Sequence, residues 1–158
     1  IIKSWWNRPQ FFEYWRSQLM AANPLQADTA CIFSAHSVPT STVGSYEDEV
    51  MSASNQIAKM VGLNHWYQAW QSAAPYGEWL GPTIESVIEQ ALIDGAKRIV
   101  CIPLGFVSDH VEILYDNDII CRNIVENAGA TYERLPMPNG NTLFMETMAK
   151  AIRERINK

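Results

Sequence analysis

The chain alternates short strand-like runs with longer amphipathic stretches, and this alternation constrains its fold more than any other feature. The runs 29–35 and 98–104 are almost continuously apolar, as strands buried on both faces of a parallel sheet are. The run 66–72 alternates and is rich in aromatic residues, and 131–135 is a shorter fourth run. These four segments are predicted to be the strands of one sheet.

Helical spacing of apolar residues predicts one helix before the first strand and another after each strand. The predicted helices cover roughly 9–22, 44–61, 82–95, the acidic stretch after Gly105 up to about residue 127, and 142–156. Strands that are separated by helices pair in parallel through right-handed crossovers. The sequence therefore predicts an α/β fold, a three-layer sandwich around a four-stranded parallel sheet, with residues 1–158 as a single domain.

Aromatic residues are concentrated at the start of the chain. The side chains predicted for the buried face of the first helix are Phe12, Trp15, Leu19 and Met20. More aromatic side chains occur here than one helix face needs, namely Trp5, Trp6, Phe11 and Phe12. We expect this surplus to cover a surface that a partner or a further domain would otherwise bury.

Charge and cysteine usage exclude several classes of function. The net charge is -5 and there is no basic run, which argues against a nucleic-acid partner. Cys31, Cys101 and Cys121 are widely spaced and form no C-x-x-C pair, so we expect buried free thiols and a reducing, cytoplasmic compartment. No apolar run approaches the ~20 residues of a membrane span, and no signal peptide is visible. The chain begins with Ile1 rather than methionine, which indicates a fragment or a processed product.

The stretch 103–118, PLGFVSDHVEILYDND, ends an apolar strand, breaks at Gly105 and continues as an acidic helix. Asp109, Glu112 and Asp116 stand at i, i+3 and i+7, which would place them on one face of an α-helix. Carboxylates just beyond the end of a parallel strand lie where open α/β sheets bind ligands. This face is therefore a candidate functional site.

The same rule selects His36, which directly follows the first predicted strand. A neutral imidazole can accept a proton or ligate a metal ion, and a carboxylate such as Glu112 can share either duty. The residues alone leave other interpretations open, because a histidine there can be a structural hydrogen-bonding group and Glu112 can simply complement the helix dipole. Asp109 is interpreted either as an N-terminal residue that complements the helix dipole or as the helix cap. Trp79 either packs under its own loop or lines a pocket.

Four motifs of the chain are similar to signature motifs of the ferrochelatase family and occur in the same order. They are FSAHSVP at 33–39, WQS at 70–72, EWLGP at 78–82 and PLGFVSDHVEILYDND at 103–118. The last motif is long and therefore specific. The resemblance extends over essentially the whole chain, but only over the C-terminal half of the usual enzyme. It implies the chelatase-like, Rossmann-like half of ferrochelatase, whose porphyrin cleft lies between two such domains.

The resemblance implies insertion of ferrous iron into a porphyrin in haem biosynthesis, with no redox step. It assigns the chemistry to His36 and Glu112, which would face each other across the bound macrocycle, His36 nearer the step that accepts pyrrole protons. Together with Asp116, which would draw in the cation, they form the implied metal-binding set. The resemblance also implies that Trp79 lines the porphyrin pocket and that Ser37 borders it.

The resemblance also sets expectations for partners and cofactors. Porphyrin and ferrous iron are expected as substrates, with no permanently bound cofactor and no iron–sulfur cluster. The missing N-terminal half or a homo-oligomer is expected to complete the cleft. Neither nucleic acid nor a transmembrane segment is expected, whereas peripheral contact with a membrane is compatible with the sequence. The choice between protoporphyrin and coproporphyrin stays open.

Two alternatives stand beside this hypothesis. The chain could be a non-catalytic half-domain that binds porphyrin or haem, or a cobalt or nickel chelatase acting on another tetrapyrrole. Those chelatases tend to place more histidines around the metal, whereas this site offers His36. Many ferrochelatases also extend the acidic row by one further turn, where this chain has Ile120.

Overall fold

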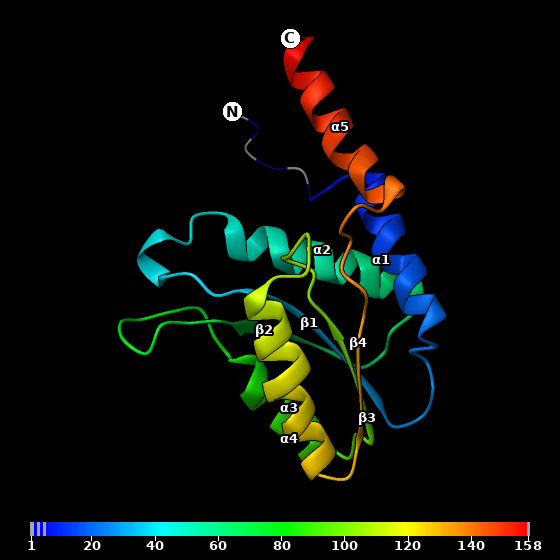
Figure 1. The fold of residues 1–158 in the computed structure, drawn as a ribbon, viewed down its shortest axis with the longest axis vertical. Coiled ribbons are helices and arrows are strands. Elements are labelled where there is room, and N and C mark those ends of the chain that lie inside the picture. The colour runs from blue at the N-terminus through cyan, green and yellow to red at the C-terminus, as the bar shows by residue number, and fades with distance from the viewer. Residues whose placement is uncertain (1, 3, 5, 158) are drawn as a thin grey trace.

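The computed structural model describes residues 2, 4 and 6–157 and contains the predicted parallel sheet (Figure 1). The elements of this part of the chain are α1 (Pro9–Ala21), β1 (Thr29–His36), η1 (Thr40–Thr42), α2 (Tyr46–Val61), β2 (Trp66–Gln71), α3 (Ile84–Ile93), β3 (Arg98–Ile102), η2 (Ile113–Cys121), α4 (Arg122–Asn127), β4 (Thr131–Arg134) and α5 (Thr142–Ile156). All strand pairs are parallel, in the order β2-β1-β3-β4. The central strands β1 and β3 are those with the most continuous apolar sequence.

Helices cover both faces of the sheet, because successive side chains of a strand point to opposite faces. In β1, Cys31 and Phe33 pack into the core shared with α1, α2 and α5, whereas Ala30 and Ile32 pack into the core shared with α3 and α4. Figure 1 shows α3 and α4 together, away from α1, α2 and α5. The predicted three-layer α/β sandwich is confirmed.

Helix α1 buries a wider face than the predicted stripe. Its buried side chains are Phe11, Tyr14, Trp15 and Leu19, whereas Met20 is 48% exposed. The reason is that α1 packs against α2 and α5 at once. Phe144 of α5 lies 6.0 Å from the ring of Phe11 and 5.5 Å from that of Tyr14. The placement of Met20 on the buried face was therefore wrong.

The aromatic surplus at the start of the chain packs largely within the chain itself. Phe11 is buried, and Trp6 packs edge-on against Phe12 with ring centroids 6.3 Å apart. Both Trp6 and Phe12 are partly buried against the core of α1, α2 and α5. Phe11, Trp6 and Phe12 thus cover the core of the chain itself, whereas the role of a partner or further domain at this surface stays a prediction, and Trp5 lies outside the described residues.

The three cysteines are free and buried, as predicted. Burial raises the pKa of the Cys31 and Cys101 thiols to about 12, so both stay protonated at neutral pH. Among the described helices, none has the length and apolar character needed to cross a bilayer.

Candidate functional site

The carboxyl ends of the strands bring two predicted site residues together. His36 is the last residue of β1 and pairs in register with Gln71, the last residue of β2. Glu112 lies in the first turn of the helix after β3. The distance between His36 Nε2 and Glu112 Oε2 is 3.6 Å, and the two side chains are 37% and 46% exposed. An imidazole and a carboxylate therefore form an open pair at the edge of the sheet where α/β proteins bind ligands.

The separation of this pair can be compared with the space that a macrocycle between the two groups would need. A flat ring needs a van der Waals contact of about 3.5 Å on each side, or about 7 Å in all. The gap of 3.6 Å between His36 and Glu112 is half of that. In this arrangement no planar ring fits between the two side chains, and the expectation that they face each other across a bound macrocycle stays a prediction.

A backbone contact selects the tautomer of His36. Its Nδ1 lies 2.5 Å from the carbonyl oxygen of Ser37. A carbonyl oxygen only accepts hydrogen bonds, so Nδ1 carries a proton and donates it. In the neutral ring the lone pair is then on Nε2, the atom that faces Glu112. This lone pair is available to accept a proton or to ligate a metal ion.

Gly105 holds the segment after β3 against the end of β1. A Cβ at this position would lie 2.5 Å from Cβ of Ala35 and 2.8 Å from its Cα, closer than real atoms approach. The amide of Gly105 also donates to the carbonyl oxygen of Ser34 at 3.1 Å. Because no side chain fits there, the backbone leading to Glu112 can lie against the residue before His36.

The helix that carries the acidic residues differs from the predicted α-helix. It begins at Val111, and the part named η2, Ile113–Cys121, is a π-helix that continues into α4. Short π-helical segments occur frequently at functional sites. The wider turn invalidates the predicted i, i+3, i+7 face, which assumed the α-helical period.

Asp109 lies before this helix and is not its cap. The interpretation of Asp109 as an N-terminal residue of the helix or as its cap was therefore wrong. Its carboxylate accepts a hydrogen bond from Asn139 Nδ2 at 2.8 Å and lies 3.1 Å from Nη1 of Arg134. The Asp109 amide donates in turn to the Asn139 side-chain oxygen at 2.9 Å. Asp109 is thus occupied by residues that follow β4 or end it.

Asp116 is held apart from the pair of His36 and Glu112. The hydroxyl of Ser72, just after β2, donates to Asp116 Oδ2 at 2.5 Å. In the described part of the chain, no three His, Cys, Asp or Glu side chains converge closely enough to hold a metal ion. The three predicted metal-binding residues therefore do not form one closed coordination site. The His36–Glu112 pair and the Asp116 carboxylate are separate groups at the same edge of the sheet.

Ser37 and Trp79 belong to one loop structure beside His36. Ser37 is buried and its hydroxyl donates to the carbonyl oxygen of Leu80 at 2.8 Å. The indole N–H of Trp79 donates to the carbonyl oxygen of Tyr76 at 2.8 Å, and its ring remains partly exposed. The polar atoms of Ser37 and Trp79 are therefore used within the loop, which leaves the Trp79 ring as the surface that a ligand can contact.

Two neighbours of the pair were not singled out from the sequence. The Tyr46 hydroxyl donates to the carbonyl oxygen of His36 at 3.0 Å, and burial raises the pKa of Tyr46 to about 12, so the hydroxyl keeps its proton. Phe106 lies with its ring 6.3 Å from that of His36 and 5.3 Å from that of His110. Tyr46 lies in the helix predicted over 44–61, and Phe106 lies within the motif at 103–118, but neither position indicates these contacts.

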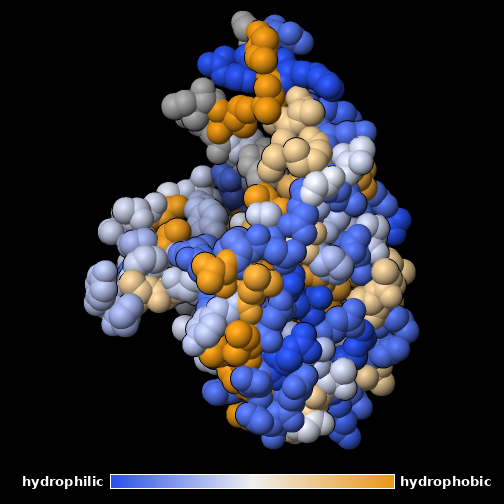
Figure 2. All heavy atoms as spheres, viewed as in Figure 1, coloured by the Kyte–Doolittle hydropathy of each residue, from blue (hydrophilic) through white to orange (hydrophobic). Residues whose placement is uncertain are grey.

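A hollow of about 290 Å³ is lined by two neighbours of His36, Tyr46 and Gly105, but by neither His36 nor Glu112. It lies between the start of the chain, α2 and the turn after β3, and its lining includes Trp6, Phe11, Tyr46, Leu104 and Gly105. On the helix that carries Glu112, Leu114, Tyr115 and Ile119 are about half exposed, and Val111 is 77% exposed. Figure 2 shows apolar surface where this helix lies at the front of Figure 1. Exposed apolar side chains gathered beside polar groups are typical of a surface that binds something else.

Comparison with known proteins gives consistent matches over the chain. The family model described as Ferrochelatase matches residues 1–156. The chain is 37% identical to a coproporphyrin III ferrochelatase of Geobacillus kaustophilus (strain HTA426) over 98% of the chain and 52% of that relative. It is 33% identical to the coproporphyrin III ferrochelatase of Listeria monocytogenes serotype 4b (strain F2365), over 98% of the chain and 53% of that relative. The chain thus spans about half the length of the curated relatives it matches.

Among solved structures, a CbiX protein from Marinobacter aquaeolei VT8 is similar to the chain in fold. The TM-score is 0.54 and the sequence identity is 14%, over 82% of this chain and 98% of that one. At this identity the likeness shows the fold alone. It agrees with the observed order of strands and helices.

Proposed function

This chain belongs to the ferrochelatase family, and on that premise we propose that it carries one half of a site that inserts ferrous iron into a porphyrin. The observation that carries the proposal is the open pair of His36 and Glu112, 3.6 Å apart at the sheet edge. The reaction exchanges two pyrrole protons for one Fe²⁺ and changes no oxidation state. It therefore needs a proton acceptor and groups that replace the water around the ion, and an imidazole with a carboxylate provides both.

The tautomer of His36 suits the proton-accepting step. Because Nδ1 donates to Ser37, the free lone pair on Nε2 is directed to the side of Glu112. A pyrrole proton that reaches Nε2 gives an imidazolium beside the Glu112 carboxylate, which stabilises the new charge. Glu112 is 46% exposed, so the proton can leave through water. The second proton can follow the same route once the ring is neutral again.

The acidic side chains suit delivery of the cation. Glu112 and Asp116 follow one another on the helix after β3, and carboxylates attract a divalent cation before it loses its water. The hydrogen bond from Ser72 holds Asp116 toward β2, short of the His36–Glu112 pair. We propose that Fe²⁺ meets Asp116 first and then the pair, where it is exchanged for the protons.

The macrocycle is proposed to lie over the pair, with the Trp79 ring and the exposed apolar side chains of the helix as part of its surroundings. Flat aromatic surfaces favour stacking with a flat aromatic substrate. The named relatives make coproporphyrin III the first substrate to test, with protoporphyrin as the comparison.

The exposed side of the His36–Glu112 pair needs a second protein surface to enclose a bound substrate. The chain spans about half the length of its relatives, and both groups of the pair are more than one third exposed. We propose that an N-terminal ferrochelatase half covers this side, and that a second copy of the chain is the competing occupant. Native mass of the purified complex distinguishes the two.

The test of the proposed function is metal insertion by the assembled protein, followed by porphyrin absorbance with Fe²⁺ or Zn²⁺. His36→Ala and Glu112→Gln are each expected to lower the rate by at least about 100-fold, the usual contribution of a general acid–base group. His65→Ala and Glu126→Gln are matched controls, because these residues are exposed and lie elsewhere. Wild-type rates for both site variants would refute the assignment. Tight porphyrin binding without insertion in any assembly would instead favour a binding half-domain.

The compartment is part of the proposal. Three buried free thiols and the bacterial origin of the named relatives support a cytoplasmic protein. Cell fractionation tests this location, and recovery with the membrane fraction at high salt would contradict it.

A further inference from the structure

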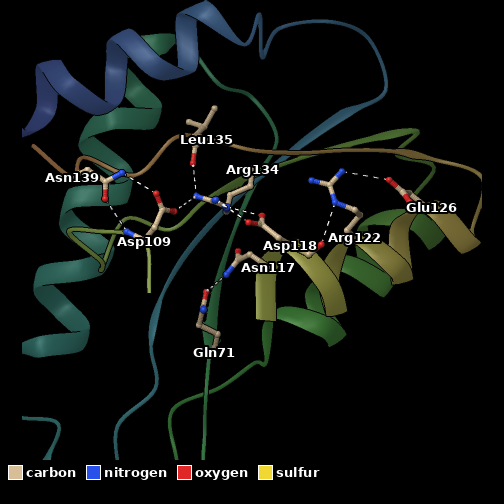
Figure 3. Close-up of polar contacts among 9 residues, drawn as sticks. All are labelled: Gln71, Asp109, Asn117, Asp118, Arg122, Glu126, Arg134, Leu135 and Asn139. Atoms are coloured by element: carbon tan, nitrogen blue, oxygen red, sulfur yellow. Dashed lines mark hydrogen bonds and ion pairs between the residues drawn. The ribbon is translucent and has the colours of Figure 1, made fainter. Parts of the chain in front are cut away.

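The last residue of β4, Arg134, joins two ends of the acidic segment with one guanidinium group (Figure 3). Its Nε and Nη2 donate to the two carboxylate oxygens of Asp118 at 2.7 and 2.9 Å. Its Nη1 lies 3.1 Å from Asp109 and also donates to the carbonyl oxygen of Leu135 at 3.3 Å. The Arg134 side chain is only 13% exposed. A two-pronged contact of this kind restricts both distance and orientation.

The two aspartates bracket the residues of the proposed site. Asp109 precedes Glu112, and Asp118 follows Asp116. A straight α-helix would separate residues nine positions apart by about 13 Å, so one guanidinium cannot reach both ends of such a helix. It reaches them here because Asp109 lies outside the helix, where the chain turns back toward β4. The contacts of Arg134 with Asp109 and Asp118 therefore link the two ends of the segment 109–118 and fix the distance between them.

Two further contacts from neighbouring elements hold the segment 109–118 in place. Asn139, in the loop after β4, binds the carboxylate and the amide of Asp109. On the side of β2, Asn117 donates to the side-chain oxygen of Gln71 at 3.1 Å, and both side chains are buried. Figure 3 shows these contacts on both sides of the helix start. The backbone between Asp109 and Asp118 is thus tied to β2 and β4.

We propose that Arg134 is a positioning residue for metal insertion, which sets Glu112 at its distance from His36 by pinning Asp109 and Asp118. This inference rests on the proposed function. Among the described contacts, Arg134 makes none with His36 or Glu112, so it acts through the backbone of the segment. No motif that resembles the family in sequence contains Arg134.

Arg134 could act through its charge or through the position that it gives to the segment, and the two roles predict opposite changes in metal affinity when Arg134 is removed. Hydrogen bonding to Asp118 raises the pKa of the Arg134 guanidinium, so its positive charge is permanent. Removing that charge leaves Asp109 and Asp118 unpaired near the site, which would strengthen attraction for a cation. Losing the positioning contact would instead weaken binding of the ion. The sign of the change in metal affinity therefore identifies the role.

The experiment measures binding of Co²⁺ to the assembled protein by calorimetry and by the visible absorption of the bound ion. The variants are Arg134→Met, Arg134→Lys, and Arg134→Met combined with Asp118→Asn, which keeps the wild-type net charge. We expect Arg134→Met and the double variant to weaken binding by about 10- to 100-fold, as loss of an outer-shell partner does. The Co²⁺ affinity of Arg134→Lys should be intermediate, because an ammonium group keeps the positive charge but cannot make the two-pronged contact of the guanidinium. In turnover, the KM for metal should rise while the KM for porphyrin stays unchanged.

Arg16→Met is the matched control, because Arg16 on α1 pairs with Glu13 and, among the described contacts, makes none with Asp109 or Asp118. Its affinity for Co²⁺ should stay at the wild-type value. Equal or tighter binding by Arg134→Met would overturn the inference while leaving the proposed function intact. Unchanged Co²⁺ binding by His36→Ala and Glu112→Gln would overturn the proposed site, and the positioning role with it.

Circular dichroism checks that each variant folds. If Arg134→Met does not fold, Arg134→Lys provides the test, because it keeps the positive charge but cannot make the two-pronged contact with Asp118. A loss of Co²⁺ affinity in Arg134→Lys supports the inference, and wild-type affinity overturns it.

Discussion

Replacement of Gly105 by alanine tests the close contact that places the acidic helix beside His36. The added Cβ would lie 2.5 Å from Cβ of Ala35 and 2.8 Å from its Cα. Ordinary carbon contacts are about 3.5 Å or longer, so roughly 1 Å of displacement is required. Overpacking of this kind destabilises a protein by about 1–3 kcal/mol. For a chain of this size, each kcal/mol lowers Tm by about 2–4 °C, so Gly105→Ala should lower it by roughly 2–12 °C.

The assay is urea unfolding together with a thermal scan of the assembled protein. Gly140→Ala is the matched control, because a Cβ there meets nothing within 4 Å. Combining Gly105→Ala with Ala35→Gly should restore only part of the stability, since the contact of 2.8 Å with the Ala35 Cα remains. Unfolding of Gly105→Ala at the same urea concentration as wild type would refute the reasoning. Loss of stability in the control to the same degree would refute it as well.

Two further predictions concern pH and helix capping. Burial raises the pKa of the Cys31 and Cys101 thiols from 9.0 to about 12, so the unfolded chain loses these protons first as pH rises. The contribution of these two thiols to stability should therefore be constant below about pH 8 and decrease above pH 9, by up to about 1.4 kcal/mol per pH unit for each thiol. Urea unfolding at several pH values checks this, and Cys101→Ala should fall less steeply; an equal slope would contradict it. Thr83 caps α3 by accepting from the Ser86 amide, so Thr83→Ala should destabilise the protein by about 1 kcal/mol without changing Co²⁺ affinity. A wild-type unfolding midpoint would show that this cap contributes nothing.

The regular elements were predictable because their signal is local. The apolar spacing predicted a helix over 142–156, the bounds that α5 has, and one over 44–61, whose end agrees with that of α2 before the left-handed Gly62. Parallel pairing followed from the alternation of strands and helices, which leaves few ways to arrange them. These features depend on residues that are neighbours in the sequence or repeat at a fixed period.

The acidic segment shows where local patterns failed. The spacing of Asp109, Glu112 and Asp116 indicated one α-helical face, but the segment is a π-helix preceded by a turn. Asp109 was interpreted as a cap, whereas its partners are Arg134 and Asn139, which lie 25 and 30 positions further along the chain. No pattern within the segment identifies such partners. The elements packed around the acidic segment determine which hydrogen bonds it forms.

The sequence by itself determined the α/β architecture and pointed to His36 and Glu112, because strand ends and their following residues can be located from local periodicity. Only the tertiary structure decided how these residues are arranged. It brings His36 Nε2 and Glu112 Oε2 to 3.6 Å, puts the free lone pair of the neutral His36 ring on Nε2, and ties the acidic segment to Arg134. The physical reason is that these properties depend on distances of a few ångströms between residues far apart in the chain. Such distances are set by packing, as at Gly105 and Ala35, and packing is a property of the folded molecule.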